Sequence, residues 1–300
     1  MKRAALLWTI VLALAPAARA GGDFVDLAAG ERTEWFVGSF GVRGIDAGSG
    51  RLTASFRAGA YPLSVAVAGR AVWVASVANG FVDGRLTRID PRTGRWRVVL
   101  HVAGSVQYVA RGARGVYALV GEGARTRVVS LDDAGQVRRV WVIPTAGRLA
   151  ADSSGCWIST NTTLLHADPA GRLRVVLHTQ LGDVATGGGA VWLPGAATIT
   201  RVDEHTLATR VLRTGRLRLG GFQHDVAVGA GALWTLDMLT PALQRRDAAT
   251  GKLERSVRLP DLADAVVATP TRVWVGVAIS HQVLAFDPRT LRRLLDVQIG

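Results

Sequence analysis

The chain has 300 residues, a formal net charge of +13 and a single cysteine, Cys156. One cysteine excludes an internal disulfide. No Pro- or Ser-rich linker and no low-complexity tract divides the chain, so a multidomain arrangement is not indicated. A charge of this size suggests anionic partners such as nucleic acid, anionic lipid or cell-wall polymer.

The N-terminus is typical of a secretory signal peptide. Lys2 and Arg3 precede an apolar segment over 4–15, and Ala18-Arg19-Ala20 fits the small-x-small rule of signal peptidase. The apolar segment is shorter than the about 20 residues that a bilayer-spanning helix needs. We therefore expect cleavage after residue 20, secreted or periplasmic localisation, and one mature domain over 21–300 without a transmembrane segment. An uncleaved anchor is the alternative.

One pattern recurs along the rest of the chain. An alternating apolar strand leads to a Gly-containing turn, a second strand with an aromatic residue, a third strand, a turn that begins with aspartate, and a fourth strand. The aromatics are Trp35, Trp73, Tyr117, Trp157, Trp192, Trp234 and Trp274, and the turn aspartates are Asp46, Asp90, Asp132, Asp168, Asp203, Asp247 and Asp287. Four short strands in about 40 residues is the size of one propeller blade.

The sequence therefore predicts an all-β, seven-bladed propeller of four-stranded antiparallel blades, because no window outside the N-terminus keeps helical apolar spacing. Each repeated aromatic is expected to fill the space between neighbouring blades. In turns such as Asp90-Pro-Arg-Thr-Gly94, aspartate caps the turn and glycine supplies a positive φ. Cys156 lies beside Trp157 in a second strand and is expected to be a buried small hydrophobe.

Two stretches carry a family resemblance. "AVWVA…RIDPRTG" at 71–94 and "DVAVGAGALW" at 225–234 resemble the secreted bacterial propellers built from YVTN-type repeats, including relatives of the streptogramin B lyases. The resemblance covers the whole mature chain and implies the fold more than an activity. In the lyase branch, a His and an acidic residue open a cyclic ester by elimination with Mg²⁺. His224 and His281 are the residues that this resemblance suggests as catalytic.

Ligands of propellers usually meet the loops at one end of the central channel. Counting back nine residues from each aromatic places equivalent first-strand positions there, with an extra residue assumed in the seventh turn. The positions are Asp26, Ser64, Tyr108, Arg148, Asp183, Asp225 and Asp264.

The four aspartates have two interpretations. They could form a partial ring of carboxylates that holds Mg²⁺, Ca²⁺ or a cationic ligand. Alternatively, they are a repeated structural part whose carboxylates accept backbone N–H groups. Tyr108 and Arg148 depart from the repeat and are candidate ligand-binding residues, together with Tyr61 and with Gln223 of the irregular loop over 215–225.

The leading functional hypothesis is a monomeric, non-catalytic scaffold that binds an unknown protein or small molecule through its channel-end loops. The alternative is a metal-dependent lyase of the streptogramin B lyase type. A further alternative is binding of single-stranded nucleic acid or another polyanion through arginines that cluster in the predicted fourth strands. Charged side chains on these outer strands would also discourage edge-to-edge pairing between molecules.

Overall fold

The computed structural model describes residues 24–57, 61–78, 80, 82–145, 147–178, 182–195, 197–214, 223–237, 240–277 and 280–299, without the side chains of 24–25 and 223–225. The secondary-structure elements of these residues are all β-strands. The described residues contain no helix long and apolar enough to cross a membrane.

The strands form seven consecutive groups of four, here called blades 1 to 7. Blades 1 to 3 contain β1 (Phe24–Ala29), β2 (Thr33–Gly38), β3 (Gly41–Asp46), β4 (Leu52–Phe56); β5 (Tyr61–Ala68), β6 (Ala71–Ala78), β7 (Asp83–Ile89), β8 (Trp96–Val102); β9 (Ser105–Gly112), β10 (Gly115–Glu122), β11 (Arg125–Leu131), β12 (Val137–Ile143). Blades 4 and 5 contain β13 (Gly147–Asp152), β14 (Gly155–Thr160), β15 (Thr163–Ala167), β16 (Leu173–His178); β17 (Ala185–Gly187), β18 (Ala190–Pro194), β19 (Thr198–Asp203), β20 (Thr209–Arg213). Blades 6 and 7 contain β21 (Gln223–Gly229), β22 (Ala232–Asp237), β23 (Ala242–Arg246), β24 (Leu253–Arg258); β25 (Ala263–Ala268), β26 (Val273–Val277), β27 (Gln282–Phe286), β28 (Arg293–Gln298).

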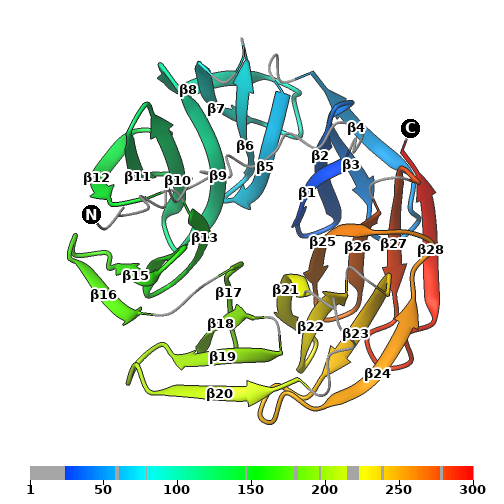
Figure 1. Cartoon of the computed structure of the whole chain (residues 1–300). Helices are drawn as coiled ribbons and strands as arrows, with labels where there is room; N and C mark the ends of the chain where they lie inside the picture. The colour runs from blue at the N-terminus through cyan, green and yellow to red at the C-terminus, as the bar shows by residue number, and fades with distance from the viewer. Residues whose placement is uncertain are drawn as a thin grey trace, which may run out of the picture.

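Each blade is an antiparallel sheet in which the four strands lie in sequence order. The first strands of neighbouring blades contact one another around the ring, and β1 contacts β25 where the ring closes (Figure 1). The predicted seven-bladed propeller is therefore confirmed. Blades 1 and 7 meet without exchanging a strand, since each keeps its own four consecutive strands.

The repeated aromatic lies between blades, as predicted. Trp73 is fully buried and packs in one cluster with Val106 and Val109 of blade 3. Trp274 packs in the same way against Leu27 and Phe36 of blade 1 and so closes the ring. The ring therefore closes through the same kind of apolar contact that joins the other blades.

Three of these tryptophans also bind the backbone of their own blade. The indole Nε1 of Trp192 donates to the carbonyl oxygen of Gly187 at 3.0 Å, five residues earlier. The equivalent bonds join Trp73 to Ala68 and Trp234 to Gly229. This bond fixes the indole over the turn between the first two strands of the blade.

The aspartate turns also form as predicted. In the turn after β7, Oδ1 of Asp90 accepts the backbone N–H groups of Arg92 and Thr93, and Gly94 has a φ of 71°. Such hydrogen bonds lower the pKa of all seven turn aspartates, since they stabilise the carboxylate. Cys156 is fully buried, and burial raises the pKa of its thiol, in agreement with the prediction of a small buried hydrophobe.

Candidate functional site

The predicted channel positions can be compared through the pairing of first and second strands. Asp26 pairs with Val37, Ser64 with Ala75, Tyr108 with Leu119 and Arg148 with Ser159, in each case two residues after the repeated aromatic. These four residues therefore occupy the same level of neighbouring blades.

The expected position of Asp264 in this set is wrong. In blade 7, Ala265 pairs with Gly276, two residues after Trp274, and therefore occupies the equivalent place. Asp264 is the additional residue of a β-bulge between Ala263 and Ala265. The count of nine residues back from Trp274 reaches Ala265 without correction, because blades 1 and 2 have a bulge at the same place and the turn of blade 7 adds no residue.

The carboxylate of Asp26 joins blade 1 to blade 2. Its Oδ2 accepts the hydroxyl of Ser64 at 2.7 Å and the backbone N–H of Val65 at 3.0 Å, and its Oδ1 accepts the N–H of Leu27 at 2.8 Å. The Ser64 hydroxyl in turn accepts the N–H of Val109 in blade 3 at 3.2 Å. Asp26 therefore fastens neighbouring blades, as the structural interpretation of the aspartates expected.

Tyr108 and Arg148 form the second half of the site. The Arg148 guanidinium carbon lies 4.7 Å from the centre of the Tyr108 ring, a cation–π contact between blades 3 and 4. Burial raises the pKa of the Tyr108 hydroxyl, while Arg148 lowers it and the charges of Asp183 and Asp26 raise it further. The two aspartates, from blades 1 and 5, are thus close enough to act on one phenol from blade 3.

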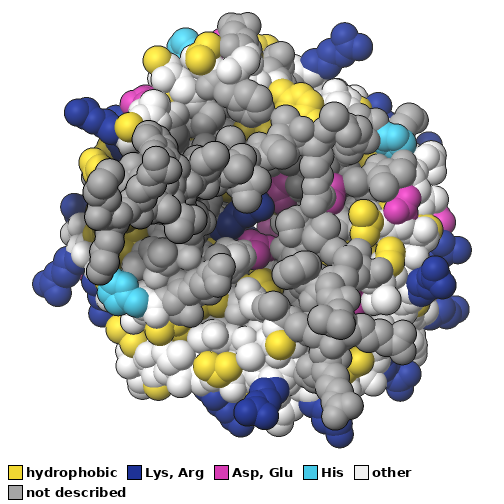
Figure 2. Space-filling view, in the orientation of Figure 1, with side chains coloured by type: hydrophobic (Ala, Val, Ile, Leu, Met, Phe, Trp, Pro, Cys, Tyr) yellow, Lys and Arg dark blue, Asp and Glu magenta, His cyan; other side chains and the backbone are white. Residues whose placement is uncertain are grey.

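We call Asp26, Ser64, Tyr108, Arg148 and Asp183 the channel cluster. Burial, reinforced by the charge of Asp183, raises the pKa of Asp26 from 3.8 to about 6, although its hydrogen bonds to Ser64, Val65 and Leu27 lower it. Blades 1 and 5 are not neighbours in the ring, so the two carboxylates repel each other across the channel. Figure 2 shows acidic and basic side chains gathered in the hollow at the centre of the ring.

Other predicted site residues lie elsewhere or outside the described part. Tyr61 starts β5 and is 44% exposed. His281 lies in the turn between β26 and β27 with a φ of 51°, and its carbonyl accepts the N–H of Ile299 at 2.9 Å. The side chains of Gln223, His224 and Asp225 lie outside the described residues, although their backbone forms the start of β21.

Of the four aspartates predicted as metal ligands, Asp26, Asp183 and Asp264 are among the described side chains and Asp225 is not. Within the described portion of the chain, no three His, Cys, Asp or Glu side chains are grouped so that they could hold a metal ion. Asp183 instead accepts the backbone N–H of Val184 at 2.9 Å, a bond that resembles that between Asp26 and Leu27.

Sequence reasoning missed one buried acid, Glu34. Its side chain is 1% exposed, and its Oε2 has no hydrogen-bond partner in the structure. Burial raises its pKa from 4.5 to about 8, against the opposing effect of Arg272 in blade 7. A signal was present, because the residue before the aromatic is apolar in the other six repeats: Val72, Val116, Cys156, Val191, Leu233 and Val273.

The arginines predicted for the fourth strands lie on the outer edge of the blades. Exposed examples are Arg97, Arg138, Arg139, Arg174 and Arg293, and Figure 2 shows basic side chains projecting around the rim. Arg216 and Arg218 lie outside the described residues. Because they belong to the outermost strands, these charges cover blade edges that could otherwise pair with another sheet.

Comparison with known proteins supports the fold alone. No family model matches the chain, and no curated protein matches it. Among solved structures, a chain of Kuenenia stuttgartiensis hydrazine synthase is similar with a TM-score of 0.71 and 12% identity, covering 91% of this chain and 97% of that one. Kluyveromyces lactis Hsv2 has a TM-score of 0.68 and 9% identity, with 93% and 100% covered.

A chain of a nidogen/laminin complex is similar with a TM-score of 0.54 and 11% identity, covering 87% of this chain and 90% of that one. At such identities the similarity extends to the propeller architecture and to no shared site. These propellers have varied functions, which is consistent with a scaffold whose binding properties depend on its own side chains.

Proposed function

We propose that this protein is an exported, non-catalytic binding propeller, and that its ligand places a cationic group at the channel cluster. The observation that carries the proposal is the buried carboxylate of Asp26 at the channel, whose pKa is raised to about 6 mainly by burial and, as the smallest contribution, by repulsion from Asp183 in blade 5. A primary amine or guanidinium between them would relieve this repulsion and receive charge-assisted hydrogen bonds. The ligand is a small molecule or a protein segment that carries such a group.

The neighbouring groups support a ligand that also has an acceptor. Arg148 supplies positive charge beside the two carboxylates, and the Tyr108 hydroxyl keeps its proton because its pKa is raised. Both groups donate hydrogen bonds. A ligand with an amine and a nearby carbonyl or carboxylate would therefore match the cluster better than a simple cation.

Thermal unfolding with N-acetyl-lysine methylamide and with free lysine as probes tests this function. A ligand that binds the folded state alone stabilises it by about 2.7 kcal/mol at a hundredfold excess over Kd. We expect a rise in Tm at pH 7.5 that shrinks at pH 5, where Asp26 is protonated, and that disappears in Asp183→Asn. N-acetyl-alanine methylamide and N-acetyl-glutamate methylamide, which carry no amine, are the matched control probes. A Tm rise that persists in Asp183→Asn, or no rise with either lysine probe, would contradict the proposal.

The lyase alternative predicts a different result in the same assay. A rise in Tm with Mg²⁺ or Ca²⁺ that EDTA reverses and Asp183→Asn abolishes would favour a metal at these carboxylates. Because the described residues include no group of three metal ligands, we derive no reaction step through a metal. Polyanion binding by the outer-strand arginines would instead appear as affinity for single-stranded DNA that falls steeply with salt.

A further inference from the structure

A second cavity lies between blades 3 and 4, where the repeat has its only non-tryptophan aromatic, Tyr117. The cavity has a volume of about 480 Å³ and is open to solvent on one side. It includes the turn that follows β9, at the opposite end of that strand from Ser105 and the channel cluster. A volume of this size is within the range of about 300–1,000 Å³ that is typical of small-molecule sites.

The cavity lies where tyrosine replaces the tryptophan of the other repeats. In blades 2, 5 and 6, the indole N–H binds the carbonyl five residues earlier and covers the first turn of the blade. The equivalent carbonyl in blade 3 belongs to Gly112, and a phenol has no indole N–H to donate to it. Tyr117 lies against Gly112 and is only half-buried, so part of its ring faces the cavity.

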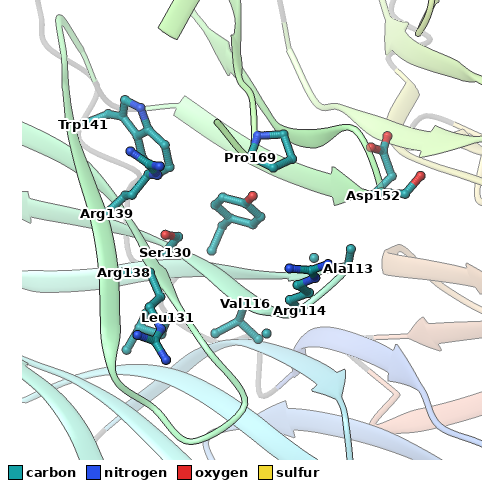
Figure 3. A pocket seen from close by; sticks show the side chains of 14 residues that line it. Ala113, Arg114, Val116, Ser130, Leu131, Arg138, Arg139, Trp141, Asp152 and Pro169 are labelled. Carbon is teal, nitrogen blue, oxygen red and sulfur yellow. The ribbon is translucent and has the colours of Figure 1, made fainter. Parts of the chain in front are cut away.

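The walls of the cavity are partly aromatic. The Tyr117 and Trp141 rings have their centres 6.2 Å apart with an angle of 34° between their planes. The Trp141 indole is fixed by a hydrogen bond of 2.9 Å from its Nε1 to the carbonyl of Gly171 in blade 4. Trp141 and Pro169 together form a rigid apolar wall against which a flat molecule can pack (Figure 3).

The same opening is surrounded by positive charge. Arg114, Arg138 and Arg139 all line the cavity, and Figure 3 shows their side chains on its periphery. Arg138 is paired with Asp132. Arg114 and Arg139 form no ion pair with any residue in the described part of the chain. The one carboxylate of the lining, Asp152, is held by the N–H of Ser154 at 2.6 Å and by the indole of Trp157 at 3.2 Å.

We propose that this cavity binds a small organic anion with a flat apolar body, whose carboxylate or phosphate is held by Arg114 on one side of the cavity or by Arg139 on the other (Figure 3). Guanidinium groups bind carboxylate and phosphate oxygens with paired hydrogen bonds, and both arginines are available for this. The Tyr117 hydroxyl remains protonated, since burial raises its pKa to about 12, and donates to the same ligand. The flat body packs on Trp141.

Isothermal titration of the protein over 21–300 with 1-naphthoate and with 1-naphthyl phosphate tests the proposal and distinguishes the two anions. We expect one of them to bind, and the neutral methyl 1-naphthoate to bind at least tenfold more weakly. The double variant Arg114→Gln/Arg139→Gln should lose at least tenfold in affinity. Arg255→Gln is the matched control, because Arg255 is an exposed arginine on the outer strand of blade 6.

Tyr117→Trp provides an independent test, because it restores the residue of the other repeats and replaces the half-buried phenol of the cavity wall by a larger ring without a hydroxyl. We expect this variant to keep its circular dichroism spectrum and to lose naphthoate or naphthyl phosphate binding. If Tyr117→Trp does not fold, the affinity of the double variant Arg114→Gln/Arg139→Gln tests the proposal instead. The proposal would be overturned by equal binding of the neutral ester, by full affinity in either test variant, or by no binding of both anions at millimolar concentration. Asp183→Asn should leave this affinity unchanged, which separates the cavity from the channel cluster.

Discussion

The hydroxyl of Ser64 lies 2.7 Å from Oδ2 of Asp26 and links the first two blades at the channel. The same hydroxyl accepts the N–H of Val109 in the third blade. One serine thus connects three blades, and it is 3% exposed. The contact makes the channel wall a structural joint that also holds the buried carboxylate of Asp26.

Replacement of Ser64 should reveal this joint. Ser64→Ala removes the acceptor of the buried Val109 N–H and one of the two hydrogen bonds to Oδ2 of Asp26, which we expect to lower the free energy of unfolding by about 1–3 kcal/mol. The pKa of Asp26 should rise above about 6, because its bond from Ser64 lowers that pKa. Urea unfolding and NMR titration of the Asp26 carboxyl measure the two effects. Ser256→Ala on the exposed face of β24 is the control, and an equal loss there would contradict the interpretation.

Glu34 should make stability depend on pH in the neutral range. Between pH 4.5 and about 8 the folded protein keeps a proton on Glu34 that the unfolded chain has released, so stability falls as pH rises. At roughly 1.4 kcal/mol per pKa unit, the loss is up to about 5 kcal/mol. We expect Glu34→Gln to be more stable than the wild type at pH 8.5 and to show a flatter profile in urea unfolding from pH 5 to 8.5. An unchanged profile would show that Arg272 already neutralises the acid.

Replacing a turn glycine that has a positive φ by alanine should lower the free energy of unfolding measurably. Gly94→Ala places a Cβ at a φ of 71° with no close steric contact, so the loss reflects backbone conformation alone. We expect about 1 kcal/mol of destabilisation in urea unfolding. Arg92→Ala in the same turn has an ordinary φ and an exposed side chain, and should stay within about 0.5 kcal/mol of wild type.

Phe36 should report on ring closure, because it packs with Trp274 where blades 1 and 7 meet. Phe36→Ala is expected to cost about 3–5 kcal/mol. Hydrogen exchange should accelerate first in β1 and β28, since no exchanged strand ties these blades together. Ile158→Ala, a buried position between blades 3 and 4, is the matched control and should not show this preference. Uniform acceleration in both variants would contradict a local role in closure.

The sequence by itself determined the repeat, the strand order and the turns, because these depend on contacts between residues close in the chain. Asp90 accepts hydrogen bonds from Arg92 and Thr93, and Trp192 donates one to Gly187. Because these bonds join residues of the same repeat, the sequence of one repeat is enough to predict them. The count from each aromatic also located the channel positions of Asp26, Ser64, Tyr108 and Arg148. It failed at Asp264, because the seventh turn was assumed to hold an extra residue, whereas its strand pairing has the same register as in blade 2.

Only the tertiary structure decided which of these residues act on one another. Asp26 and Asp183 belong to blades 1 and 5, which face the same channel only once the ring has closed. The charge of Asp183 therefore acts on Asp26 only in the folded propeller. Glu34 is placed near Arg272 in the same way. The cavity beside Tyr117 is lined by residues of blades 3 and 4, which come together only when the two blades pack in the ring.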